Sequence, residues 1–180
     1  KFYYENTGNA SHANYARRQG ALNPFDGVTD VGRLSKPAFV DVDNDGDMDL
    51  VIGRKEADLK HYYENTGNPT NPAYTRREGA SNPFRRVANM AERSVPAFVD
   101  VDNDGDMDLV VGFMGGDLKF YFENTGNPTN PAYTRRQGTL NPFDGVANVG
   151  AWSVPSFVDV DNDGDMDLVI GRFEGDLKHY

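Results

Sequence analysis

One acidic segment occurs three times in this chain of 180 residues, and its recurrence constrains the fold more than any other feature. The segment reads Asp-Val-Asp-Asn-Asp-Gly-Asp-Met-Asp-Leu and begins at Asp41, Asp100 and Asp159, a spacing of 59 residues both times. Residues 60–118 and 119–177 differ at only 16 of 59 positions. Each repeat therefore needs nearly the same surroundings as the next, which is typical of a ring, a solenoid or a string of similar units.

Each acidic segment carries five carboxylates on alternate residues, where unpaired charges would repel one another strongly. A hard divalent cation would relieve that repulsion, and Ca²⁺ binds six to eight oxygens from loops with the spacing D-x-D-x-D-G. Glycine stands at the sixth position, where we expect a sharp turn that a side chain would obstruct. We therefore predict three structural calcium sites, one per loop. The predicted ligands are Asp41, Asp43, Asp45, Asp47, Asp49, Asp100, Asp102, Asp104, Asp106, Asp108, Asp159, Asp161, Asp163, Asp165 and Asp167.

The composition narrows the choice of partners. The three loops hold fifteen of the 28 acids that give the chain its net charge of −10, so the acidity indicates metal sites and argues against nucleic acid. There is no cysteine, and no apolar run approaches membrane-spanning length, so neither disulfides nor membrane insertion is expected. The chain begins at Lys1 within the repeat pattern, and we expect it to be a mature or excised piece of a longer repetitive chain.

The residues around each loop predict β-strands and no helices. Apolar, β-branched runs flank the loop, an aromatic strand and a polar strand follow, and Asn-Thr-Gly-Asn turns with Gly8, Gly67 and Gly126 are expected to supply positive φ. In the first complete unit the four strands are expected at residues 37–42, 49–53, 58–65 and 73–77. We predict that the first strand is the most buried and the last is solvated.

The predicted fold class is all-β, with three tandem 59-residue, four-stranded antiparallel blades like those of a β-propeller. The array is expected to be open-ended or part of a larger one. The expected units are a partial blade at 1–35, calcium-loop blades at 36–94 and 95–153, and a partial calcium-loop blade at 154–180.

The segment Phe-Val-Asp-Val-Asp-Asn-Asp-Gly-Asp-Met-Asp-Leu-Val-Ile-Gly resembles the FG-GAP (VCBS-type) repeat, the calcium-bearing blade of integrin α-subunit propellers, fungal seven-bladed lectins and many bacterial surface proteins. The resemblance covers all three units. It implies that the first, third, fifth and ninth residues of each loop, such as Asp41, Asp43, Asp45 and Asp49, bind Ca²⁺ by side chain. It implies that Asp47 and its equivalents, Asp106 and Asp165, bind through the main-chain oxygen.

Other residues of the units are assigned structural or modification roles. Met48, Met107 and Met166 are expected to be apolar plugs beneath the loops, and the aromatic residues of the third strand to pack between blades. The repeated Asn-Pro-Phe is read as a turn with a buried Phe. The change from Asp26-Gly27 to Arg85-Arg86 is interpreted as surface variation. Asn9 opens an Asn-Ala-Ser glycosylation acceptor.

Two functions fit these residues, and neither is enzymatic, because the carboxylates are assigned as ligands and no acid–base pair is left over. The first is an extracellular or cell-surface structural or adhesive repeat, stabilised by calcium, which self-associates or continues into further repeats. The second is a lectin-like module that binds glycans in grooves between blades.

Overall fold

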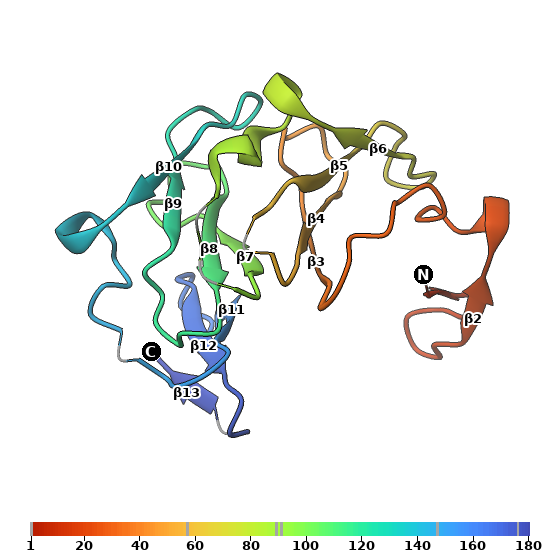
Figure 1. Cartoon of the computed structure of the whole chain (residues 1–180). Helices are drawn as coiled ribbons and strands as arrows, with labels where there is room; N and C mark the ends of the chain where they lie inside the picture. The colour runs from red at the N-terminus through yellow and green to blue at the C-terminus, as the bar shows by residue number, and fades with distance from the viewer. Residues whose placement is uncertain (1, 57, 89, 91, 147, 176) are drawn as a thin grey trace.

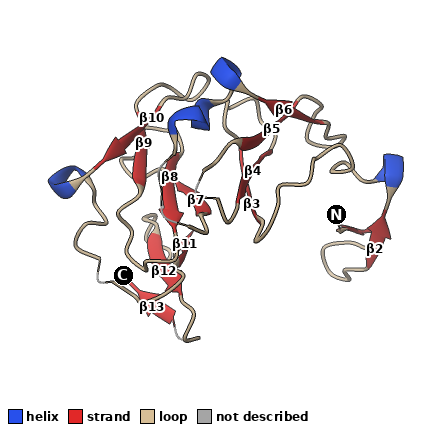
Figure 2. Cartoon of the chain, in the orientation of Figure 1, coloured by secondary structure: helices blue, strands red, loops and turns tan. Residues whose placement is uncertain are grey.

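The computed structural model describes residues 2–56, 58–88, 90, 92–146, 148–175 and 177–180. Within them the chain forms four antiparallel sheets joined by loops and short 3-10 helices (Figure 1, Figure 2). The all-β prediction is therefore confirmed. Among these residues no helix has the length and apolar character needed to span a bilayer.

The sheets follow one another in chain order. The first contains β1 (Tyr3–Asn6) and β2 (Tyr15–Arg18), and the second contains β3 (Lys36–Val40), β4 (Asp49–Gly53), β5 (His61–Asn65) and β6 (Tyr74–Arg77). The third contains β7 (Val95–Val99), β8 (Asp108–Gly112), β9 (Tyr121–Asn124) and β10 (Tyr133–Arg136), and the fourth contains β11 (Val154–Val158), β12 (Asp167–Gly171) and β13 (Leu177–His179). The 3-10 helices are η1 (Gly20–Leu22), η2 (Gly79–Ser81), η3 (Pro83–Arg86) and η4 (Gly138–Leu140).

The predicted meander of four strands is present in the second and third sheets, where each strand pairs with its neighbour in sequence. Figure 1 shows the sheets arranged along an open arc, with β3, β7 and β11 toward its inside and β6 and β10 toward its outside. The unit boundaries at residues 35, 94 and 153 stay predictions.

Burial does not follow the predicted gradient. The second strands β4 and β8 are buried at every position, whereas β3 has three exposed residues out of five. The prediction that the first strand is the most buried is therefore wrong. A first strand has only one neighbour in its own sheet, while a second strand is flanked on both sides and packs against adjacent sheets. The outer strands β6 and β10 each expose their two central residues, so the prediction of a solvated last strand holds in part, but Tyr133 of β10 is buried.

Neighbouring sheets are held together by apolar contacts, as the aromatic third strands predict. One buried cluster joins Val51 and Tyr62 of the second sheet to Leu109 and Phe122 of the third. Phe84 of the Asn-Pro-Phe turn is fully buried in this cluster, and its ring stacks on Tyr133 of the next sheet at a centroid distance of 4.7 Å. The turn therefore fastens one sheet to the next.

The fourth sheet departs from the common register. In the second sheet Val51 pairs with Tyr62, whereas its equivalent Val169 pairs with His179, one residue short of the position equivalent to Tyr62. A shift of one residue turns side chains to the opposite face of a sheet. Leu177 of this shifted strand is 70% exposed, while its equivalent Leu59 is fully buried in a cluster with Leu109 of the next sheet.

The glycines of the Asn-Thr-Gly-Asn turns do not have the predicted positive φ. Glycine is needed there for space. A Cβ at Gly67 would lie 2.4 Å from the carbonyl oxygen of Asn71, and one at Gly8 would lie 2.0 Å from that of His12. The turn folds its own backbone against the glycine, so the sequence identified the residue but not its reason.

We predict that Gly67→Ala lowers the free energy of unfolding by about 1–3 kcal/mol, because the added methyl meets backbone that cannot move aside cheaply. Urea unfolding measures the effect. The matched control is Gly27→Ala, at an exposed glycine whose Cβ would meet no heavy atom within 4 Å and whose φ is not positive. That variant should be neutral or gain up to about 1 kcal/mol. Equal midpoints for the two variants would contradict the steric explanation.

Candidate metal centres

Each acidic loop joins the first strand of a sheet to the second, as in residues 41–48 between β3 and β4. Two residues give the loop its curvature, Asn44 with φ of 57° and Gly46 with φ of 94°, and both recur in the other loops. A Cβ at Gly46 would meet no heavy atom within 4 Å. The expectation that a side chain would obstruct the loop is therefore wrong, and the glycine is required because its φ is positive.

Backbone amides organise the carboxylates. The Asp41 carboxylate accepts hydrogen bonds from the amides of Asp45, at 3.2 Å, and Gly46, at 3.0 Å. Asp45 accepts one from the amide of Asp47 at 3.1 Å. The same bonds form in the loops that begin at Asp100 and Asp159. The side chains are thus positioned by their own loop before any ligand is considered.

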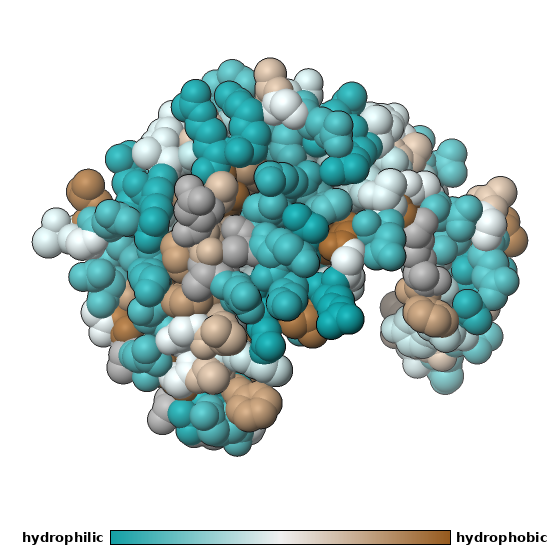
Figure 3. Space-filling view, in the orientation of Figure 1, coloured by the Kyte–Doolittle hydropathy of each residue, from teal (hydrophilic) through white to brown (hydrophobic). Residues whose placement is uncertain are grey.

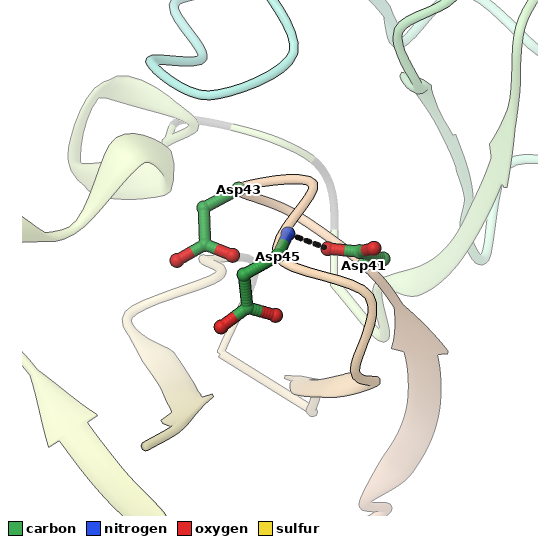
Figure 4. A group of neighbouring side chains, drawn as sticks. All are labelled: Asp41, Asp43 and Asp45. Atoms are coloured by element: carbon green, nitrogen blue, oxygen red, sulfur yellow. Dashed lines mark hydrogen bonds between the residues drawn. The ribbon is translucent and has the colours of Figure 1, made fainter. Parts of the chain in front are cut away.

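This geometry gathers three carboxylates in each loop. In the first loop, Asp41, Asp43 and Asp45 each offer an oxygen within 4.8 Å of the other two. Figure 4 shows Asp43 and Asp45 side by side, with the hydrogen bond between the Asp45 amide and Asp41. The equivalent clusters are Asp100, Asp102 and Asp104, and Asp159, Asp161 and Asp167. Burial, and next the neighbouring carboxylates, raise the pKa of Asp43 and of Asp102.

The seventh residue of the loop is buried in the first two copies. Asp47 is 5% exposed and Asp106 is 6% exposed, and each has an Oδ1 that is buried without a hydrogen-bond partner. Burial, and then the charges of four neighbouring aspartates, raise the pKa of Asp106 to about 6. A buried, unpartnered carboxylate oxygen beside other acids is unfavourable unless a positive charge lies close by.

The ninth residue serves the fold. Asp49 accepts hydrogen bonds from the Asn65 amide at 2.7 Å, the Tyr62 hydroxyl at 3.0 Å and the Val42 amide at 3.2 Å. Burial nevertheless raises its pKa to about 7, against the lowering effect of these three donors. Asp49 therefore ties the loop to the third strand, and it lies outside the gathered cluster of its loop.

The other two copies of this residue differ from each other. Asp108 has the same three partners, with the Asn124 amide at 2.7 Å, the Tyr121 hydroxyl at 2.8 Å and the Val101 amide at 3.3 Å. Asp167 accepts from the Val160 amide at 3.0 Å and joins the cluster of Asp159 and Asp161. Spacing alone could not distinguish a ligand from an anchor at this position.

The donor set fits a hard divalent cation. All the gathered atoms are carboxylate oxygens, which are hard ligands that calcium and magnesium prefer. The buried, unpartnered Oδ1 atoms of Asp47 and Asp106 would be stabilised by a nearby positive charge. The assignment of individual aspartates as ligands stays a prediction.

The loop methionines are exposed to solvent. Met48, Met107 and Met166 are 57%, 44% and 60% exposed, so the prediction that they are apolar plugs is wrong. In the first two loops the eighth residue points outward between two buried aspartates.

Asn9 is exposed, and its Oδ1 accepts hydrogen bonds from the amides of Ser11 and His12. Its glycosylation stays a prediction.

The fold and these loops define a class: all-β repeat proteins with an acidic, metal-competent loop between the first two strands of each sheet. Compared with models of known protein families, the chain matches the FG-GAP-like repeat over residues 41–111 and again over 100–170. The chain therefore belongs to the FG-GAP-like repeat family. The searches of curated proteins and of solved structures gave no match.

We predict that the metal-free protein becomes more stable as pH falls from 8 to 5. The folded state raises the pKa of Asp49 to about 7 and of Asp106 to about 6, above the roughly 3.9 of an unfolded aspartate. The folded state therefore binds protons more tightly, so stability is gained as pH falls through 7 toward 4 and lost as it rises again. Urea midpoints in excess chelator measure this.

Asp106→Asn is the matched control, since it removes one of the titrating groups and should flatten the pH profile between 5 and 7. A midpoint that stays constant or falls from pH 8 to pH 5 in the parent protein would contradict the raised pKa values.

Proposed function

We propose that this chain is a calcium-stabilised structural or adhesive repeat of an extracellular or cell-surface protein, in which each sheet is a propeller-like blade. The observation that carries the proposal is the repetition of one loop geometry, with three gathered carboxylates and, in two copies, a buried carboxylate oxygen that lacks a partner. A bound cation would neutralise these acids. Membership of the FG-GAP-like repeat family supports the surface location.

Calcium would be held in the first loop by the side chains of Asp41, Asp43 and Asp45 and the main-chain oxygen of Asp47, and in the second loop by their equivalents. In the third loop the side chains would be those of Asp159, Asp161 and Asp167. Bound there, the ion supplies positive charge and nothing else. Asp49 then carries the effect into the sheet, because its carboxylate bonds both the loop, at Val42, and the third strand, at Asn65. We propose no catalytic role for any of these carboxylates.

The fourth sheet supports an open-ended assembly. Val158 is 44% exposed, whereas its equivalents Val40 and Val99 are buried against the following repeat. Val160 is 59% exposed, whereas Val42 is buried. We propose that a further repeat covers this face, supplied either by continuation of the same chain or by a second copy. Head-to-tail contacts that do not close build filaments, which suits a surface appendage or matrix.

The calcium part of the proposal predicts different effects for two aspartates of one loop. Asp45→Ala should change stability in chelator by less than about 1 kcal/mol, because Asp45 is exposed and accepts one hydrogen bond. It should also reduce the gain on adding calcium, which is about 2.7 kcal/mol per site at a hundredfold excess over Kd. Asp49→Ala should cost about 2–4 kcal/mol even in chelator, since it leaves three buried donors unpaired.

Urea unfolding of the two variants and the parent, with chelator and with millimolar calcium, measures these differences. An unchanged midpoint of the parent protein on adding calcium would refute the metal role. An equal calcium response in Asp45→Ala and the parent would remove Asp45 from the ligand set.

The assembly is tested by sedimentation velocity of the 180-residue chain in calcium over a wide concentration range. We expect species above the 19.9 kDa monomer, and their loss when Val158 and Val160 are both changed to Asp. Leu140→Asp is the control, at a side chain that is also exposed, 65%, but lies in η4. A monomer at all concentrations would exclude self-association and leave chain continuation as the source of the covering repeat.

A further inference from the structure

A groove lies between the second and third sheets and reaches the first acidic loop at Asp43. Its volume is about 580 Å³, which is in the range of sites that hold small ligands. One wall is formed by η2 and η3 and the other by the turn that precedes β10. Figure 3 shows mostly hydrophilic residues over this upper part of the molecule, where η2, η3 and β10 lie in Figure 1.

Two arginines give one wall a positive charge. Arg85 and Arg86 are exposed residues of η3 that line the groove. The Nη1 of Arg85 donates to the carbonyl oxygens of Ala80 and Asn82, both at 3.4 Å, and neither arginine has a carboxylate partner among the described residues. These two guanidinium groups therefore keep free donors and an uncompensated charge.

The other charged groups of the groove are already engaged. Arg77 forms an ion pair with Glu64, in which Arg77 Nε lies 2.8 Å from Glu64 Oε2. The positive charge of Arg77 is therefore compensated by the negative charge of Glu64. Asp43 belongs to the acidic cluster of its loop. Arg85 and Arg86 are thus the groups that can attract an anion into the groove.

The opposite wall offers neutral hydrogen-bonding groups. Thr129, Asn130 and Thr134 are exposed there, and Ser81 adds a hydroxyl from the η2 side. Hydroxyl and amide groups pair with the hydroxyls of a sugar, while a guanidinium pairs bidentately with a carboxylate or sulfate. The two walls together suit a ligand that carries both.

Of the three units, only the middle one carries this arginine pair. The residues equivalent to Arg85-Arg86 are Asp26-Gly27 in the first unit and Asp144-Gly145 in the third. At the equivalent position the other units therefore carry an acid instead of two bases. Charge reversals occur elsewhere between units, as between Arg33 and Glu92, but the one at Arg85 and Arg86 lines a groove.

From the geometry we propose that this groove binds an acidic saccharide, with its anionic group on Arg85 and Arg86 and its hydroxyls on the opposite wall. Such a ligand needs only a short chain, because the groove is small. The site does not depend on self-association. Because Asp43 also lines the groove, binding is measured at one fixed calcium concentration, so that its outcome is separate from that of the proposed function.

Isothermal titration calorimetry tests the site at one fixed calcium concentration and low salt, with three tetrasaccharides: a sulfated heparin fragment, a polygalacturonate fragment and neutral maltotetraose. Inorganic sulfate and phosphate are added as separate probes. We expect one or both acidic tetrasaccharides to bind with one site per chain, and maltotetraose at least tenfold more weakly. The stronger of the two acidic probes distinguishes sulfate from carboxylate as the anionic group.

The test variant is Arg85→Asp with Arg86→Gly, which imports the residues that the other two units carry and should therefore fold. It should weaken binding of the acidic probe at least tenfold. The matched control is Arg33→Glu with Lys36→Val, which imports residues of the middle unit, makes the same change of −3 in net charge and lies outside the groove. That variant should bind within about twofold of the parent.

Three outcomes would overturn the proposal. They are no binding of either acidic probe at millimolar concentration, equal weakening in the test and control variants, and binding of free sulfate or phosphate as tightly as of the tetrasaccharides. The second outcome would show that net charge alone explains the weaker binding. The third would show that the site binds a simple anion and does not recognise a saccharide.

Discussion

The hydrogen bonds of one buried carboxylate join the acidic loop to the sheet that carries it. In the second sheet Asp49 holds the start of the loop at Val42 and the end of the third strand at Asn65, and Asp108 does the same in the third sheet. Any force on the loop, whether repulsion between its acids or attraction to a cation, therefore reaches the third strand. The aromatic side chains of that strand form the core between sheets, so the loop and the core are mechanically coupled.

In the fourth sheet the ninth aspartate has different partners. Asp167 accepts a hydrogen bond from the Val160 amide and lies in the cluster of Asp159 and Asp161. There β13 pairs one residue away from the common register, and Leu177 faces solvent. The backbone ladder alone is almost indifferent to such a shift, since every residue offers the same donor and acceptor. In the second and third sheets, which share one register, Asp49 and Asp108 bond the end of the third strand, so these side chains favour that register over its neighbours.

Much of this fold was predictable because periodicity and turn residues act locally. The strands around each loop and the meander follow from β-branched runs, and the turn at Gly46 follows from the glycine at the sixth position, although its positive φ was not the reason expected. The roles of individual loop residues depend on contacts with residues that are distant in sequence. Whether Asp49 is a ligand or an anchor depends on an amide 16 residues away, and the outward direction of Met48 depends on how the loop turns between two buried aspartates.

Repetition also explains why residues that differ between units were the hardest to interpret from the sequence. A pattern shared by three units identifies what every unit needs, so it identifies the loops and the core. Residues that differ between units, such as Arg85 and Arg86, look like surface variation until the fold places them beside a groove. In a repeat protein the shared residues carry stability, and a binding site specific to one unit can arise only from the positions where the units disagree.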